Sequence, residues 1–130
     1  PYDSIKSFAP VSLLATAPLI VCANLSLPAK DARELVALAK AKPGSLSFGS
    51  SGIGAAAHLT TELLMLNTGI RMTHVPYKGT APALQALISG EIQLLLDTPS
   101  SLLPHVRSGK IKVLGMASEK RIATAPDIPT

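Results

Sequence analysis

From Asp31 onward, the chain alternates between segments with the apolar spacing of a helix and short apolar runs typical of strands. Such alternation with short connections requires right-handed crossovers, which produce a largely parallel sheet covered on both faces. We therefore expect an α/β domain built as a three-layer sandwich. The expected helices cover residues 31–42, 55–67, 80–89 and a short stretch before Gly109, and the expected strands cover residues 46–49, 72–75, 93–96 and 111–116.

The preceding residues 7–29 carry no charge, which raises the possibility of a membrane-spanning helix. Pro10 and Pro18 interrupt this stretch. We therefore interpret residues 11–14 and 19–22 as two strands that turn at Pro18, and not as a membrane span. The chain also opens without the charged start and apolar run of a signal peptide, as expected for a fragment or a processed form.

Composition limits the class of protein. The chain has 130 residues, room for one domain, and its 47% hydrophobic residues exclude disorder. Twelve Lys and Arg against eight Asp and Glu give a net charge of +4, but the basic residues are scattered and only four aromatic residues occur. This pattern does not favour nucleic-acid binding. The lone Cys22 excludes an internal disulfide and a cysteine-based zinc cluster.

In open parallel sheets, ligands bind where the carboxyl ends of strands meet the starts of helices. Residues 49–54, 76–80 and 97–101 fit this description. The first of these turns, Gly-Ser-Ser-Gly-Ile-Gly, would let main-chain N–H groups approach a phosphate or carboxylate. It matches neither a P-loop nor a dinucleotide fingerprint. A purely structural turn and an anion site both remain open.

The other two turns carry side chains that suit either a structural role or ligand binding. Tyr77, Lys78 and Thr80 offer a phenol, a cation and a hydroxyl, yet the same residues also fit an ordinary turn followed by a helix cap. Asp97 follows an apolar strand. It is either a helix cap or a bridge to a surface Lys, or an acceptor for a ligand or water at the edge of the sheet.

The sequence does not suggest a catalytic or metal site. His58, His74 and His105 lie far apart in the sequence and lack zinc-ligand spacing. His58 lies one helical turn before Glu62, which favours a local pair, and His74 is expected to be a packed or edge residue of its strand. Residues 49–52 lack the spacing of a nucleophile elbow. We therefore expect a binding protein, not an enzyme, and no cofactor.

Short motifs rich in Pro, Gly and polar residues are spread over nearly the whole chain. They are Phe8-Ala9-Pro10-Val11, Lys42-Pro43-Gly44, Gly49-Ser50-Ser51-Gly52-Ile53-Gly54 with His58-Leu59, His74-Val75-Pro76-Tyr77-Lys78-Gly79, Ser89-Gly90, Gly109-Lys110 and Pro126-Asp127-Ile128-Pro129-Thr130. In this order, they resemble the tripartite tricarboxylate transporter receptor family, the Bug-type periplasmic solute-binding proteins. The string from His74 to Gly79 is the most specific of them.

The resemblance implies a type II periplasmic-binding-protein fold, in which two α/β lobes close on a small carboxylate and deliver it to membrane transporter subunits. Residues 1–130 would form one lobe, the second, with residues 1–7 and 118–130 as connections between the lobes, in a periplasmic protein. Ala55 stands where many members have Ser or Thr, so contacts of that hydroxyl do not transfer. The ligand-binding residues that the resemblance implies are Ser50, Ser51, Gly52, Gly54, Tyr77, Gly79, Thr80 and Asp97.

Two other classes remain open from the sequence. One is the effector-sensing lobe of a transcription regulator, which would need a helix-turn-helix outside this chain. The other is an enzyme domain that binds phosphate at the Gly-rich turn and depends on Ser50 or Ser51. The identity of the solute is not contained in the sequence.

Overall fold

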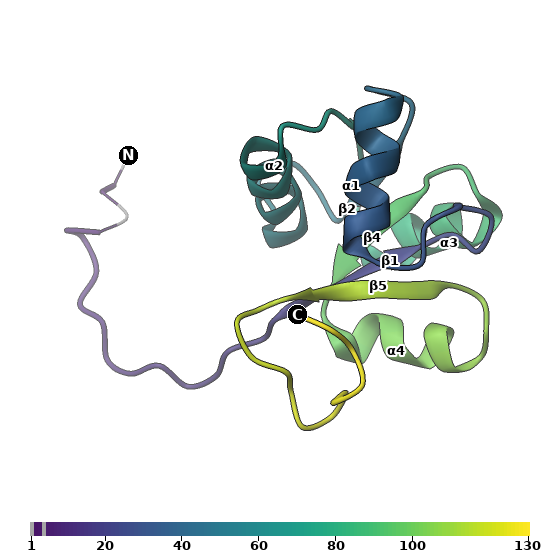
Figure 1. The fold of residues 1–130 in the computed structure, drawn as a ribbon. Helices are drawn as coiled ribbons and strands as arrows, with labels where there is room; N and C mark the ends of the chain where they lie inside the picture. Colours follow the sequence, from purple (N-terminus) through teal and green to yellow (C-terminus); the bar gives the residue numbers. More distant parts are fainter. Residues whose placement is uncertain (1, 4) are drawn as a thin grey trace.

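A mixed sheet of five strands, in the order β3-β2-β4-β1-β5, forms the centre of the computed structural model, which describes residues 2, 3 and 5–130 (Figure 1). Helices connect most of the strands, as the alternating pattern predicts. The strands are β1 (Leu19–Ala23), β2 (Ser47–Ser50), β3 (Thr73–Pro76), β4 (Leu94–Asp97) and β5 (Lys112–Ala117), and the helices are α1 (Ala32–Ala41), α2 (Ala56–Thr68), α3 (Thr80–Ser89) and α4 (Pro99–Arg107).

The strand directions confirm a largely parallel α/β sheet with one reversed strand. β2 pairs in parallel with β3 and β4, whereas β1 pairs antiparallel with β4 and β5. β5 therefore runs in the direction of β4. Because β2, β3 and β4 are parallel, the turns that follow them lie at one edge of the sheet. We call residues 50–55, 77–79 and 97–98, which lead into α2, α3 and α4, the carboxyl edge.

The sheet separates two hydrophobic cores, which confirms the three-layer sandwich. α1 and α2 pack on one face and α3 and α4 on the other, and Figure 1 shows α1 and α2 above the sheet and α4 below it. Along β1, Val21 and Ala23 belong to the first core, while Ile20 and Cys22 belong to the second. Burial raises the pKa of the Cys22 thiol to about 12, so the side chain behaves as a small apolar group.

Local hydrogen bonds and backbone conformation explain where the helices begin and end. The Asp31 side chain accepts a hydrogen bond from Glu34 N–H at 2.8 Å, and Glu34 in turn accepts one from Lys30 N–H at 2.7 Å. These contacts stabilise the first turn of α1. At its other end, α2 stops at Gly69, which has a left-handed conformation with φ of +71°.

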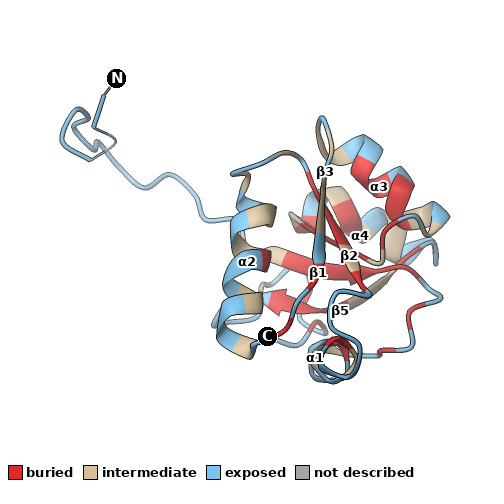
Figure 2. Cartoon of the chain, turned by 90° about the horizontal axis from the view of Figure 1, so that it is seen from above, coloured by how far each residue is buried: buried red, intermediate tan, exposed pale blue. Residues whose placement is uncertain are grey.

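One predicted helix face is wrong. The apolar spacing of α2 predicts that Ala56, Leu59, Leu63 and Leu66 face the core, but Ala56 is exposed, and the exposed fractions of the three leucines are 58%, 55% and 79%. The smaller Ala57 and Thr61 face the sheet instead, and Figure 2 shows the outer face of α2 in pale blue. Nearly every position of α2 is apolar or small, so periodicity alone does not identify the face; small residues let the helix approach the strands closely.

The expected strand over residues 11–14 is also wrong. Residues 8–18 contain no strand, and Val11 and Leu14 are 99% and 95% exposed. Alternating apolar residues form a strand only beside a partner, and none of the described strands lies next to this segment. Figure 1 shows the N-terminal segment extending away from the sheet, with the first strand starting at Leu19.

The C-terminal segment returns to the sheet. Met116 N–H donates a hydrogen bond to Pro129 C=O at 2.8 Å, and Ala125 and Ile128 are buried in the second core. The connecting roles of residues 1–7 and 118–130 remain predictions. None of the helices in the described part of the chain is long and apolar enough to cross a membrane.

Candidate ligand-binding edge of the sheet

Three helices begin at the carboxyl edge, and none of them has a capping side chain. The first turns of α2, α3 and α4 also contain no acidic residue. By contrast, α1, which follows the antiparallel strand β1, has both the capping Asp31 and the acidic Glu34. Uncapped helix starts offer free N–H groups and a partial positive charge. The carboxyl edge therefore has the electrostatics of an anion-binding site.

The Gly-rich turn between β2 and α2 is held by its own hydrogen bonds. Gly52 and Gly54 have φ of +145° and +81°, conformations that other residues rarely adopt. Gly52 N–H donates to Ser50 Oγ at 3.2 Å, and Gly54 N–H donates to His58 Nδ1 at 3.0 Å. Both of these predicted ligand donors are thus occupied within the chain.

The donors that remain available lie beside these two glycines. Ala55 has the extended backbone of an N-cap residue, with φ of −63° and ψ of 156°, but its methyl group accepts no hydrogen bond. The N–H groups of Ser51, Ala56 and Ala57 have no partner in the described part of the chain. These groups could bind the oxygens of an anion.

Ser50 supports the turn from inside. It is fully buried, and its Oγ contacts His74 Nε2 at 2.7 Å and Gly52 C=O at 2.9 Å. Its hydroxyl is therefore directed into the protein. Ser51, the other predicted hydroxyl of this turn, is exposed.

Asp97 connects the starts of α3 and α4. One carboxylate oxygen accepts a hydrogen bond from the Thr80 hydroxyl at 2.6 Å, and the other accepts one from Thr98 N–H at 2.6 Å. Gly79, the residue before α3, has φ of +113°. Asp97, Thr80 and Gly79 thus come together at the edge, as predicted, with the carboxylate of Asp97 engaged in holding Thr80 in place.

Tyr77 is placed differently from the other predicted residues. Its N–H donates to Ser50 C=O at 3.0 Å, while its ring packs against Gly49 and the second core, on the α3 side of the sheet. Burial and the charge of Glu91 raise the pKa of the phenol, which therefore stays protonated at neutral pH. The main chain of Tyr77 lies at the carboxyl edge, whereas its ring packs below this edge, on the face of the sheet that α3 covers.

Two histidines belong to this region and were not among the predicted site residues. His58 and His74 stack with ring centroids 4.0 Å apart, and His74 stacks on Phe48 at 4.8 Å. The predicted local pair of His58 with Glu62 is confirmed, at 3.5 Å. The contact between the two histidines had no signal in the sequence, because it depends on how α2 packs on β3. No group of three or more His, Cys, Asp or Glu among the described residues could hold a metal ion.

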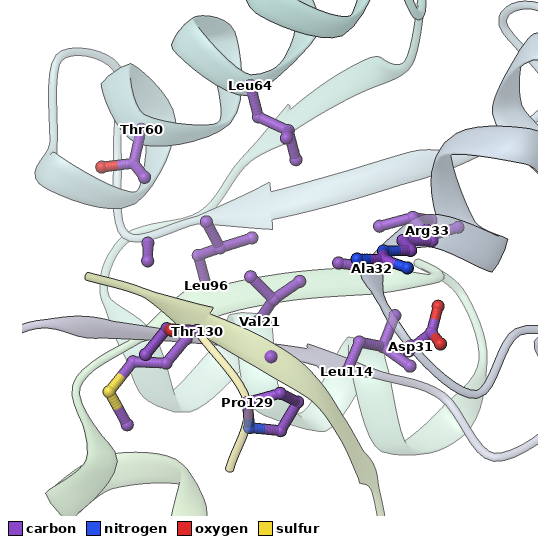
Figure 3. A pocket seen from close by; sticks show the side chains of 14 residues that line it. Val21, Asp31, Ala32, Arg33, Thr60, Leu64, Leu96, Leu114, Pro129 and Thr130 are labelled. Carbon is purple, nitrogen blue, oxygen red and sulfur yellow. The ribbon is translucent and has the colours of Figure 1, made fainter. Parts of the chain in front are cut away.

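A separate groove of about 390 Å³ lies between α1 and α2 over the sheet (Figure 3). It contains none of the predicted ligand-binding residues. Its walls are mainly aliphatic, with Val21, Leu64, Leu96 and Leu114 pointing into it. The lining also includes Arg33, but Asp31 lies in the same wall and its side chain caps α1, so the groove has no uncapped helix start. We therefore place the candidate site at the carboxyl edge.

A three-layer α/β unit with this edge has the architecture of one lobe of a periplasmic binding protein. The family profile described as tripartite tricarboxylate transporter family receptor matches residues 1–130. The chain belongs to this family, as its motifs predicted.

Individual relatives agree with this assignment. Protein BugT of Bordetella pertussis is 35% identical over 130 residues, which are the whole of this chain and 40% of BugT. The solved structure of R. palustris Rpa4515 with adipate has 35% identity and a TM-score of 0.89, covering 99% of this chain and 43% of that one. MatC from Rhodopseudomonas palustris with bound malate has 31% identity and a TM-score of 0.82, covering 88% and 39%. The chain therefore spans about two-fifths of the length of these relatives.

Proposed function

We propose that this chain is one lobe of a periplasmic solute-binding receptor, which captures a small carboxylate for a transporter of the tripartite tricarboxylate type. The observation that carries the proposal is the convergence of three uncapped helix starts at one edge of the sheet. Membership of the receptor family supports the same function. Adipate and malate, bound in two structural relatives, indicate the class of ligand.

The available donors suit a carboxylate group. Its two oxygens can accept hydrogen bonds from the N–H groups of Ser51, Ala56 and Ala57, at the positive end of α2. The carboxylate of Asp97 keeps its negative charge, but both of its oxygens accept hydrogen bonds from Thr80 and Thr98, so it is held at the starts of α3 and α4 and does not occupy the donors of α2. The predicted contacts of Gly79 and Thr80 with the ligand remain part of the proposal, although the Thr80 hydroxyl already donates to Asp97.

The edge favours capture without turnover. Ser50 and His74 lie within hydrogen-bonding distance, as in a nucleophile and its base, but Ser50 is fully buried and its Oγ also contacts both polar main-chain groups of Gly52. A nucleophile must reach its substrate. The phosphate-dependent enzyme is therefore the weaker alternative.

A lobe that forms half of a cleft should bind weakly by itself. In a two-lobe receptor, the second lobe closes over the ligand and supplies the remaining contacts. Since this chain spans about two-fifths of its relatives, we place the other contacts in the rest of the parent protein.

Calorimetric titration of the parent protein and of residues 1–130 with adipate, malate, citrate, glutamate and inorganic phosphate tests this proposal. We expect the parent to bind at least one carboxylate, and the isolated lobe to bind it at least about 100-fold more weakly. Submicromolar binding by the lobe alone would overturn the shared cleft. Binding of phosphate and of no carboxylate would overturn the proposed ligand class.

A further inference from the structure

Three stacked rings connect the first core with the Gly-rich turn. Phe48 of β2 and His74 of β3 are cross-strand partners whose ring centroids lie 4.8 Å apart. His58 of α2 covers His74 at 4.0 Å, with an angle of 11° between the rings. Phe48 is fully buried. The two imidazoles therefore extend a rigid stack from the core to the turn.

The hydrogen bond from Gly54 determines where His58 carries its proton. A main-chain N–H can only donate, so Nδ1 of His58, 3.0 Å from Gly54 N, must be the unprotonated nitrogen. The ring proton of neutral His58 is then on Nε2, which lies 3.5 Å from a carboxylate oxygen of Glu62. This arrangement holds the second half of the turn.

Counting protons at Ser50 assigns His74 in the same way. Ser50 Oγ contacts Gly52 N–H, Gly52 C=O and His74 Nε2, yet the hydroxyl has a single proton. Gly52 N–H must donate to Oγ, and Gly52 C=O must accept from it. His74 Nε2 is therefore the second donor to Ser50. Through Ser50, His74 holds the first half of the turn.

We propose that His58 and His74 are positioning residues that hold the Gly-rich turn, and that protonation of the pair releases it. A second proton on His58 would occupy Nδ1, where Gly54 N–H already points, so this hydrogen bond would be lost. Two imidazolium rings 4.0 Å apart would also repel each other. On the proposed function, on which this last step rests, acid would then disorder the carboxylate site.

The surroundings of the pair set the direction of this pH dependence. α2 supplies Glu62, whose carboxylate lies 3.5 Å from His58 Nε2 and favours protonation of His74. β2 supplies Phe48 and Ser50, which do not titrate in this range. Burial and His58 lower the pKa of His74, against the smaller opposite effect of Glu62. We therefore expect the Gly-rich turn to be ordered at neutral pH and released in acid.

Nuclear magnetic resonance of residues 1–130 without ligand tests the positioning role. We expect both neutral rings to carry their proton on Nε2, and the Gly54 amide signal to shift together with the signals of the His58 ring on acidification from neutral pH. His58→Phe keeps a stacking ring but loses the acceptor, so the Gly54 amide should exchange about tenfold faster and no longer respond to pH. His105→Phe on α4 is the matched control, and its Gly54 amide should behave as in the unchanged chain.

Two results would overturn the inference: a proton on His58 Nδ1 at neutral pH, or a Gly54 amide that titrates unchanged in His58→Phe. Should that variant not fold, titration of the unchanged chain still tests the positioning role. The inference requires that the Gly54 amide and the His58 ring shift with the same midpoint. Calorimetry of the parent with adipate adds the functional readout. The affinity of the unchanged parent protein for adipate should fall about fivefold from about pH 7.5 to about pH 6, and that of His58→Phe should stay constant. Absence of binding to adipate, malate, citrate and glutamate at every pH would refute the ligand class, whereas the Gly54 amide alone tests the positioning role.

Discussion

Replacing Ala55 with Asp would place a carboxylate at the uncapped start of α2. The backbone of Ala55 is already extended, with φ of −63° and ψ of 156°, as an N-cap requires. The new side chain could therefore accept a hydrogen bond from Ala57 or His58 N–H without a change in the backbone. A bond to Ala57 N–H would occupy one of the donors that we assign to the ligand.

The two consequences have opposite signs. A new N-cap contributes about 1 kcal/mol to the free energy of unfolding, and the favourable charge at the helix start adds about 0.3–1 kcal/mol. For 130 residues, this corresponds to a rise in Tm of roughly 3–8 °C. The ligand, however, would lose the Ala57 donor and meet a second negative charge. Repulsion of about 4 kcal/mol at 4 Å, before relaxation, predicts a loss of affinity of at least about 100-fold.

Differential scanning calorimetry of residues 1–130 measures the first effect, and calorimetric titration of the parent protein measures the second. Ala55→Asn is the matched control, because it caps α2 without adding a charge. It should raise Tm similarly and weaken carboxylate binding less than Ala55→Asp. If Ala55→Asp raises Tm but leaves carboxylate affinity unchanged, the start of α2 does not contact the ligand. If neither variant raises Tm, the first-turn N–H groups are not free.

Three further predictions concern the fold. Gly49→Ala places a Cβ 2.5 Å from Ile92 Cδ1 and should lower the free energy of unfolding by about 1–3 kcal/mol in urea titrations, whereas no loss would mean that this contact relaxes freely. Leu95→Ala, at a fully buried position, should lower the free energy of unfolding by about 2–5 kcal/mol. Leu63→Ala, on the exposed face of α2, should change it by less than about 0.5 kcal/mol. Equal losses in the two variants would contradict the observed helix face. Because the folded state lowers the pKa of His74, neutral His74 is favoured on folding, so unfolding free energy should fall as pH drops below about 6.5, the ordinary value for His. His74→Phe should reduce that slope, and an identical slope in the variant would assign the pH dependence to other groups.

The sequence determined the order of the elements and the places where they end. These signals act within a few residues, so they can be recognised without knowledge of the fold. They are the apolar periodicity of the helices, Asp31 before α1 and Gly69 after α2. Strand-helix alternation then required a largely parallel sheet, and a parallel sheet brings its strand ends to one edge. The candidate turns were predictable for this reason.

The tertiary structure alone decided which groups these turns leave free. Gly52 and Gly54 are predicted to bind the ligand, but their N–H groups donate to Ser50 and His58, and the available donors lie beside them. Likewise, the hydroxyl of Thr80 and the carboxylate of Asp97 are 17 residues apart and meet only because α3 and β4 pack together.

The errors have the same physical origin. α2 is apolar on nearly all sides, so its buried face depends on how closely Ala57 and Thr61 can approach the sheet. Residues 11–14 are rich in apolar residues that favour strands, but they have no described neighbour to pair with. Local periodicity indicates only which helix or strand a segment is able to form. Which partner it meets depends on the packing of the whole chain, where contacts between distant residues carry most of the stabilising free energy.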